Sequence, residues 1–279
     1  MPNRKPWSEP NERLGLPDST DSGPFEGMPA HLLYHLPKWF TSAGYHVDLS
    51  AIALRLHIGW TPEPYEDPGY SLLKAIEDQA GSQYQVKVIQ GLDLCLYTTK
   101  PSEREEVGIP LEQILYLGGS AYRVSSTYDG LERRVDPVAT AAYAAATKST
   151  PDGNTSAADH LRAAWKAAYG IQPNASLAYG EAIKAIEAAA IPVLLPNDRT
   201  ATLGKILGAL KQKPETIVLA IGDGDASAVI GMMRTVWDGH SDRHGSTTTK
   251  RVGDEAARAA VHLAVTLVQL FRQGSIRTK

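Results

Sequence analysis

Two arginines and two histidines lie close together within residues 231–245, whose sequence is GMMRTVWDGHSDRHG. Histidine has a reference pKa of about 6.5, so it can accept or donate a proton near neutral pH. Arginine is a permanent cation, and its planar guanidinium presents donors in a fork that matches phosphate oxygens. Arg234, His240, Arg243 and His244 are therefore suited to acid and base chemistry next to a phosphate without a metal ion.

The segment before these side chains is predicted to be the helix that positions them. Apolar residues share one stripe at helical spacing, which predicts a buried face: Ala226, Val229, Ile230, Met233 and Val236. We expect the helix to reach about Trp237 and to end at Gly239, because glycine commonly follows a last helical turn. A second face has members three or four residues apart: Ser227, Gly231, Arg234 and Asp238. Arg234 should therefore point away from the buried stripe, toward whatever lies beside the helix.

Length and composition are those of an ordinary globular chain. With 279 residues, 43% hydrophobic content and a net charge of −3, we expect two domains of roughly 100 to 150 residues each. The slight acidity argues against a protein that coats nucleic acid through its overall field, and it leaves room for a local basic site. The single cysteine, Cys95, excludes an intrachain disulfide framework and a cysteine-rich zinc site.

The sequence predicts no association with a membrane. No apolar run approaches the roughly 18 residues of a membrane span, and the first residues lack the apolar core of a signal peptide. We therefore expect a cytoplasmic location.

The N-terminal half is predicted to comprise a disordered leader over residues 1–25 and a small α+β domain over residues 26–136. Alternating apolar residues predict two β-hairpins. One joins 84–88 to 92–96 around Gln90-Gly91, and the other joins 121–127 to 131–135 around Asp129-Gly130.

The same half is also predicted to contain helices. A short helix or helix pair is expected over residues 29–40, interrupted at Pro37, and another helix over 70–79, ended by Gly81. Residues 47–57 fit helix and strand equally well. The domain has no glycine-rich phosphate loop, paired metal ligands or nucleophile elbow, so we assign it no chemistry and interpret its scattered His and Asp residues, such as His46, Asp48 and His57, as structural.

Residues 137–279 are predicted to form an all-α bundle, which makes the fold class α+β. Helical spacing is clear over 140–147, 156–170, 178–191, 203–210, 226–237 and 254–272. The last helix is apolar nearly all round, apart from one narrow polar stripe: Arg258, His262, Thr266, Gln269 and Gln273. Such a helix is central to a bundle or shared with a second subunit. We expect both roles, and hence a homodimer through the C-terminal helices.

Four segments of this half carry a family resemblance: AYGEAIKAIEAAA, TLGKILGAL, MMRTVWDGHSDRHG and EAARAAVHLAVTLVQLF. From about residue 163 onward, the chain resembles the C-terminal domain of bacterial abortive infection proteins. That domain is similar to the HEPN superfamily of helical bundles, many of which are metal-independent ribonucleases that act as dimers in toxin and phage-defence systems. The resemblance implies a helical bundle that cleaves RNA, with an antitoxin or a phage trigger as a further partner.

The resemblance also implies roles for particular residues. The family motif is an arginine followed, after about four to six residues, by a histidine, and Arg234 and His240 match it; the family's terminal His-Gly pair instead matches His244 and Gly245. Arg234 would bind the scissile phosphate, and His240 or His244 would transfer a proton, with no cofactor and no metal. RNA contacts are expected from three further cations: Arg243, Lys250 and Arg251.

Other interpretations stay open at this stage. Arg234 and Asp238 have the spacing of an ordinary ion pair on a helix, and histidines after a helix can simply meet its carbonyl end. A zinc site at His240 and His244 and a calcium site in the GDGD turn at 222–225 are conceivable with few ligands. The alternative functions are a non-catalytic bundle that binds RNA or assembles with proteins, and a dimeric structural or regulatory protein.

Overall fold

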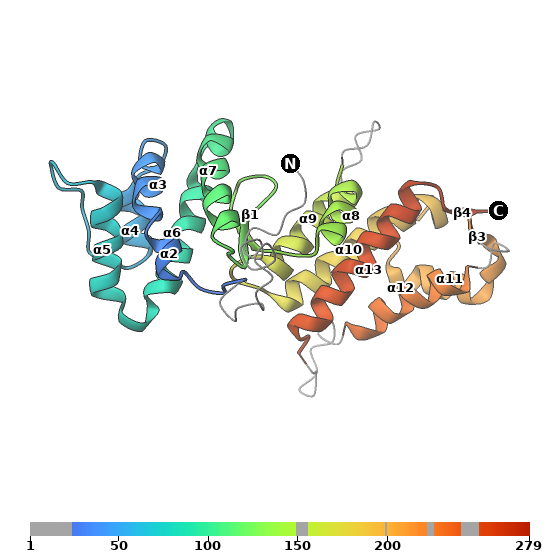
Figure 1. Cartoon of the computed structure of the whole chain (residues 1–279). Coiled ribbons are helices and arrows are strands. Elements are labelled where there is room, and N and C mark those ends of the chain that lie inside the picture. Colours follow the sequence, from blue (N-terminus) through green and yellow to red (C-terminus); the bar gives the residue numbers. More distant parts are fainter. Residues whose placement is uncertain (1–23, 149–155, 199, 222–225, 241–250) are drawn as a thin grey trace, which may run out of the picture. The chain divides into compact units, whose positions relative to one another are not determined.

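The computed structural model describes residues 24–148, 156–198, 200–221, 226–240 and 251–279 (Figure 1). The chain divides into two compact units, Met1–Arg134 and Val135–Lys279, close to the predicted division after residue 136. The described part is mostly helical and contains two small two-stranded sheets. None of its helices is both long and apolar enough to cross a lipid bilayer.

The N-terminal unit is built mainly of helices. They are α2 (Ala30–Leu33), α3 (Leu36–Ala43), α4 (Leu49–Arg55), α5 (Pro68–Ala80), α6 (Tyr84–Thr98) and α7 (Arg104–Leu117), with 3-10 turns η1 (Gly81–Gln83) and η2 (Pro101–Glu103). The predicted helix pair is confirmed, but Pro37 lies in the first turn of α3 and does not interrupt it. Proline is tolerated there because the first helical N–H groups have no partner in the helix. Gly81 ends α5 as predicted, with a φ of 52°.

The segment that fitted helix and strand equally is helix α4. Asp48 caps it, accepting hydrogen bonds from the backbone N–H groups of Ser50 and Ala51 at 2.9 and 3.2 Å. His57 follows it with a φ of 59°, the left-handed conformation that closes many helices. His46 lies against Glu103, with Nδ1 3.3 Å from Oε2. Asp48, His57 and His46 thus have structural positions: a helix cap, the residue that follows the helix, and a contact with Glu103.

The hairpin predicted around Gln90-Gly91 is wrong, because residues 84–98 form the single helix α6. Its buried side chains recur at helical spacing: Val88, Ile89, Leu92, Cys95 and Leu96. Val86, which a hairpin face would have buried, is 45% exposed. Gly91 lies inside the helix, where a Cβ would be 3.3 Å from Leu56 Cδ1, so the glycine permits close packing and makes no turn. Burial makes the Cys95 thiol a very weak acid by raising its pKa.

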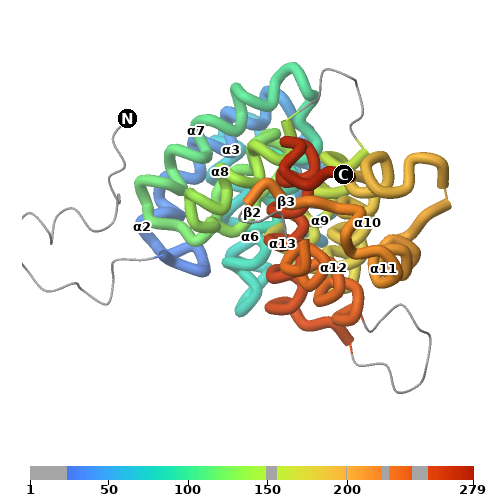
Figure 2. The backbone as a smooth tube through the Cα atoms, turned by 90° about the vertical axis from the view of Figure 1, so that its right-hand side faces the viewer, coloured from blue at the N-terminus to red at the C-terminus, as the bar shows by residue number. Residues whose placement is uncertain are grey.

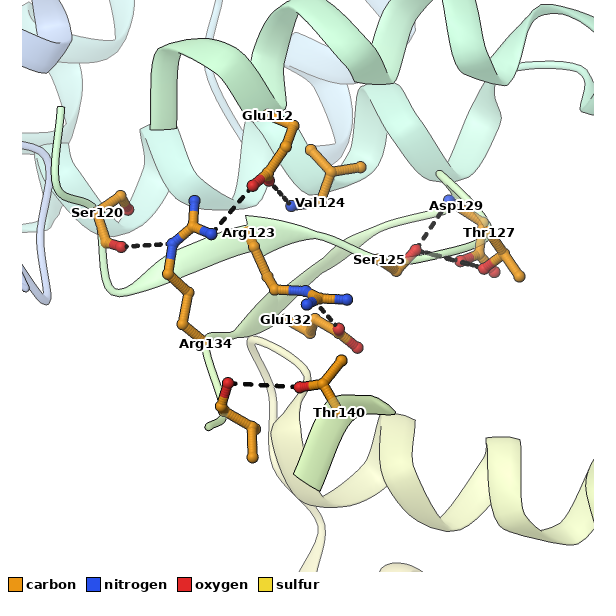
Figure 3. Close-up of polar contacts among 11 residues, drawn as sticks. Glu112, Ser120, Arg123, Val124, Ser125, Thr127, Asp129, Glu132, Arg134 and Thr140 are labelled. Atoms are coloured by element: carbon orange, nitrogen blue, oxygen red, sulfur yellow. Dashed lines mark hydrogen bonds and ion pairs between the residues drawn. The ribbon is translucent and has the colours of Figure 1, made fainter. Parts of the chain in front are cut away.

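The hairpin predicted around Asp129-Gly130 is confirmed. Strands β1 (Tyr122–Val124) and β2 (Leu131–Arg133) pair antiparallel. Figure 3 shows how polar side chains hold it: Glu112 on α7 accepts hydrogen bonds from Val124 N at 2.8 Å and from Arg134 Nη1 at 3.0 Å. These bonds explain why a short hairpin is stable beside the helices.

The C-terminal unit is a helical bundle with a small sheet. Its elements are α8 (Pro137–Ala146), α9 (Ser156–Tyr169), α10 (Ala175–Leu194), α11 (Leu203–Gln212), η3 (Pro214–Thr216), β3 (Ile217–Leu219), α12 (Ser227–Gly239), α13 (Asp254–Arg272) and β4 (Ile276–Thr278). All six predicted helices are present, although α10 continues past Pro192 to Leu194. The antiparallel pairing of β3 with β4 was not predicted.

Helix α13 is the centre of this bundle. It packs against α8, α9, α10, α12 and β4, and it runs beside α10 in both views (Figures 1 and 2). This central position accounts for its apolar character. Its polar stripe joins neighbouring helices: His262 Nε2 lies 2.7 Å from the Tyr169 hydroxyl on α9, and Gln269 Nε2 donates to Ala142 O on α8 at 2.5 Å. His262 is partly buried here.

A partly buried carboxylate links α9 to α10. Glu181 on α10 lies 2.7 Å from both His160 Nδ1 and Lys184 Nζ. Burial raises the pKa of this carboxyl, but the hydrogen bonds from Lys184 and His160 outweigh burial and hold the pKa below its ordinary value. Because the folded pKa is depressed, the interaction stabilises the fold above the unfolded pKa of about 4.3, and this stability is lost as pH falls through the folded pKa.

We therefore expect Glu181→Gln to lower the free energy of unfolding at neutral pH and to flatten its pH dependence in the acid range. The measurement is urea unfolding at several values between about pH 7 and pH 3. Glu66→Gln, at an exposed loop residue, is the control and should follow the unchanged protein. Identical pH dependence with and without Glu181 would contradict the assignment.

Candidate phosphate-binding pocket beside helix α12

Helix α12 has the predicted faces. Val229, Met233 and Val236 are buried against the core, and the helix ends at Gly239 as expected. Arg234 lies on the exposed side. The apolar stripe of α12 therefore faces the core, and Arg234 lies on another, exposed face of the helix.

Neighbouring helices fix the C-terminal end of α12. The Tyr179 hydroxyl on α10 donates a hydrogen bond to Val236 O at 2.9 Å. A Cβ at Gly239 would lie 2.4 Å from that hydroxyl oxygen, so glycine is needed for close approach as well as for termination. On α11, a Cβ at Gly204 would lie 2.6 Å from the Trp237 ring, so these helices also meet closely.

His240 follows α12 and packs on α10. Its ring is stacked on Tyr179, with ring centroids 5.3 Å apart and an interplanar angle of 6°. Six residues at about 100° each place Arg234 and His240 roughly 120° apart around the helix. Accordingly, no hydrogen bond or ring contact joins the two among the described residues. The arginine and the histidine that match the family motif thus have different neighbours: His240 stacks on Tyr179, and Arg234 lines a pocket beside α12.

Two substitutions distinguish the hydrogen bond of the Tyr179 hydroxyl from the stacking of its ring on His240. Tyr179→Phe should keep the stacking on His240 but lower the free energy of unfolding by about 1 kcal/mol, because the buried Val236 carbonyl loses its donor. Tyr179→Ala should lose the stacking as well. Urea unfolding gives the first effect, and the ring-current shift of the His240 imidazole protons in NMR spectra gives the second. A Phe variant as stable as the unchanged protein would count against this geometry.

The face of α12 that carries Arg234 lines a pocket of about 660 Å³, called here the Arg234 pocket. Its lining comes from α11, η3, β3, α12 and the segment after β4. Half of the lining residues that the structure describes are apolar: Leu210, Pro214, Ile217, Val218, Ala226 and Ile230. The others are polar, charged or glycine: Lys211, Glu215, Ser227, Gly231, Arg234 and Lys279.

Among the residues that the structure describes, the lining of this pocket has more cationic than acidic side chains. The cationic side chains are Lys211, Arg234 and Lys279, and Glu215 is the one acidic side chain. All three cations are exposed. None of their side-chain nitrogen atoms lies within 4.0 Å of an Asp or Glu carboxylate oxygen of the described residues, so none forms an ion pair there. The ion pair between Arg234 and Asp238, which their spacing left open as an alternative, is likewise not formed. The guanidinium and both ammonium groups therefore have donors left for a phosphate.

The small sheet places a further cation beside this pocket. Val218, which lines the pocket, is paired across the strands with Arg277. Directly paired residues point to the same face of a sheet, with Cβ atoms about 5 Å apart. Arg277 therefore lies next to the pocket wall and adds to its positive field.

Sequence reasoning found one of these cations and missed the rest. Lys211, Arg277 and Lys279 are far from Arg234 in the chain. Lys211 comes from α11, which packs against α12, whereas the pairing of β3 with β4 brings Arg277 and Lys279 near the pocket. Two lysines at the end of α11, Lys211 and Lys213, were a weak signal of a basic surface. No spacing rule connects them to α12.

The remaining predicted residues stand as follows. His244, Arg243 and Lys250 lie outside the described residues. Arg251 is exposed just before α13 and does not belong to the described lining of the Arg234 pocket. The GDGD turn considered for calcium, and His244 of the histidine pair considered for zinc, also lie outside the described residues. Among the described residues, no group of three His, Cys, Asp or Glu side chains could hold a metal ion.

A pocket in the N-terminal unit has the opposite charge. It has a volume of about 560 Å³ between α5 and the loop before it. Its carboxylates outnumber its single lysine, Lys74: Glu63, Glu66, Asp67 and Asp78. This pocket would repel a phosphate.

Charge is also divided between the halves of the sequence. Residues 135–279 carry 16 Lys and Arg against 13 Asp and Glu, whereas residues 1–134 carry 12 against 18. An anionic ligand is therefore expected to favour the C-terminal unit.

Comparison of the chain with protein-family models, curated proteins and solved structures finds no match to any of them.

Proposed function

We propose that the C-terminal unit, residues 135–279, binds RNA and cleaves it without a metal ion, as a homodimer in a phage-defence (abortive infection) or toxin system. The observation that carries this proposal is the Arg234 pocket. Three exposed cations without ion-pair partners among the described residues line one concave site on a unit with net positive charge. The HEPN-like motif around Arg234 supports cleavage in addition to binding.

The pocket suits the RNA backbone for electrostatic reasons. A guanidinium can bind two phosphate oxygens at once, and the lysines add charge that attracts the polyanion. In a transition state, the same arginine would stabilise the negative charge that builds on the phosphate. Binding of this kind weakens steeply as salt rises, because it releases counterions from the nucleic acid.

The proton transfer is assigned to His244. His240 stacks on Tyr179 on the α10 side of the helix end, whereas Arg234 faces the pocket. His244 carries the family's His-Gly pair with Gly245. One histidine per chain suffices if two copies place their motifs face to face, and Arg243, Lys250 and Arg251 then extend the contact with the backbone.

The experiment compares His240→Ala and His244→Ala in cleavage of bulk cellular RNA with excess chelator. We expect His244→Ala to lose cleavage by about 10²-fold to 10⁴-fold, the range for removal of a general acid or base, and His240→Ala to retain it. The opposite result would assign the proton transfer to His240. Cleavage that survives both changes would overturn the mechanism.

A second candidate is a bundle that binds RNA without cutting it. The described lining of the Arg234 pocket contains no histidine, which favours this alternative. It predicts that RNA binding depends on Arg234 while RNA stays intact under every condition, including expression of residues 135–279 alone in cells. Toxicity that disappears with Arg234→Gln would favour the nuclease.

A further inference from the structure

The Arg234 pocket combines charge with apolar surface in one cavity. Its cations lie on α11, on α12 and after β4, while aliphatic side chains from three elements form a wall: Leu210, Ile217, Val218 and Ile230. A site for phosphate alone would need only the cations. We propose that the pocket takes one whole nucleotide, with its phosphate at Arg234 and Lys211 and its base against the aliphatic wall; this inference rests on the proposed function, since it specifies which part of the RNA enters the site.

The size of the pocket favours a nucleotide over a smaller anion. Small-molecule sites in proteins commonly occupy about 300 to 1,000 Å³, and this one occupies about 660 Å³. A phosphate ion would leave most of that space to water. A base, a ribose and a phosphate together would cover both the cations and the apolar surface.

The wall is rigid where it meets the core. Leu210 and Ile217 are only 4% and 2% exposed, so the unit's own packing holds them in place. Ile230 and Val218 are partly exposed and complete the surface that a base would cover. Burial of apolar surface contributes roughly 25 cal/mol per Å², so the base adds affinity that the phosphate lacks.

The nature of the wall also predicts how selective the site is. No aromatic ring belongs to the described lining, and aliphatic side chains contact the faces of all four bases in the same way. Sequence is read through hydrogen bonds to base edges, which an aliphatic wall cannot make. The pocket should therefore accept any base.

Glu215 gives the site a preference for ribose. It is the one acidic side chain in the described lining, and it contributes nothing to holding a phosphate. As an acceptor it can bind a ribose hydroxyl, and the 2′-hydroxyl is the group that lets a protein tell RNA from DNA. Glu215→Gln should therefore reduce the preference for ribonucleotides over deoxyribonucleotides.

The test is calorimetric titration of the full chain with AMP, dAMP, adenosine and inorganic phosphate at low salt. We expect AMP to bind at least about tenfold more tightly than inorganic phosphate or adenosine, and more tightly than dAMP. Arg234→Gln should weaken AMP by about tenfold or more, in line with the loss of a charged hydrogen bond, whereas Arg55→Gln, an exposed helical arginine of the other unit, should not.

A second variant tests the apolar wall. Val218→Thr keeps the shape and the strand preference of the side chain but replaces a methyl group with a hydroxyl. It should weaken AMP several-fold and leave inorganic phosphate unchanged. Equal affinity for AMP and inorganic phosphate, or AMP binding that is unaffected by both Arg234→Gln and Val218→Thr, would overturn the proposal.

The result separates this inference from the proposed function. AMP binding that depends on Arg234, without any cleavage of RNA, would leave the nucleotide pocket standing and remove the nuclease. RNA cleavage that depends on Arg234, with AMP no better than phosphate, would keep the nuclease and remove the nucleotide pocket.

Discussion

Arg234→Gln is expected to weaken RNA binding by at least about tenfold at low salt, because a hydrogen bond to a charged group contributes about 1.5–3 kcal/mol. Glutamine keeps much of the length and the helix preference of arginine, so α12 should be preserved. The cation at this position has no ion-pair partner among the described residues. Its loss should therefore act on the ligand and leave the fold intact.

The measurement is fluorescence anisotropy of a labelled single-stranded RNA at several salt concentrations. A lost phosphate contact should lower the salt slope by about one. Arg55→Gln removes the same charge from an exposed helix position in the other unit, and it should change neither affinity nor slope. If the two variants bound RNA equally well, the Arg234 pocket would not be the binding site.

Trp165→Ala is expected to have the largest effect on stability, a loss of about 3–5 kcal/mol in the free energy of unfolding. Trp165 is 2% exposed. Its ring is stacked on Tyr143 with centroids 4.2 Å apart, and it contacts Tyr169 and His262. Truncation would leave a cavity where α8, α9 and α13 meet.

Urea unfolding followed by circular dichroism measures this effect, with a separate transition expected for each unit. Only the transition of the C-terminal unit should shift. Trp60→Ala is the matched control, because Trp60 lies partly exposed in the N-terminal unit and donates a hydrogen bond to Ser71 Oγ. A Trp165 variant that lost no more stability than the Trp60 variant would contradict the packing described here.

The helical half could be predicted well because its signals are local. In α13, residues 254–272, the predicted and observed bounds agree, since apolar spacing and the flanking glycines all point to the same ends. The central place of α13 follows from its all-round apolar character, but the partners of its polar stripe do not. The contact between His262 and Tyr169 joins residues 93 positions apart, which no local pattern specifies.

The errors in the other half have a common physical cause. Residues 84–96 alternate every second residue and also repeat at helical spacing, so a short window fits both structures. In the helix, Gly91 packs closely against Leu56 and Phe40. This tertiary contact favours the helix over the hairpin, and it cannot be predicted from the local sequence. The hairpin around Asp129-Gly130 could be predicted because an Asp-Gly pair favours a tight turn by itself, without any tertiary contact.

The candidate site was predictable only in part. Arg234 could be placed on the outer face of α12 from periodicity alone, and the structure puts that face in the wall of a pocket. Part of the remaining lining depends on β3 and β4, strands of three residues each that pair Leu219 with Ile276, 57 positions apart in the chain. Such short strands leave no recognisable sequence pattern, so the position of Lys279 near Arg234 could not be predicted.

Incubation of the purified full chain with cellular RNA in excess chelator, with analysis of product ends, tests the central claim most directly. We predict chelator-resistant cleavage that leaves cyclic phosphate ends, because the 2′-hydroxyl attacks the phosphate next to it without a metal ion. Cleavage that stops when the chelator is added, or RNA that stays intact with the full chain and with residues 135–279 alone, would contradict a metal-free ribonuclease.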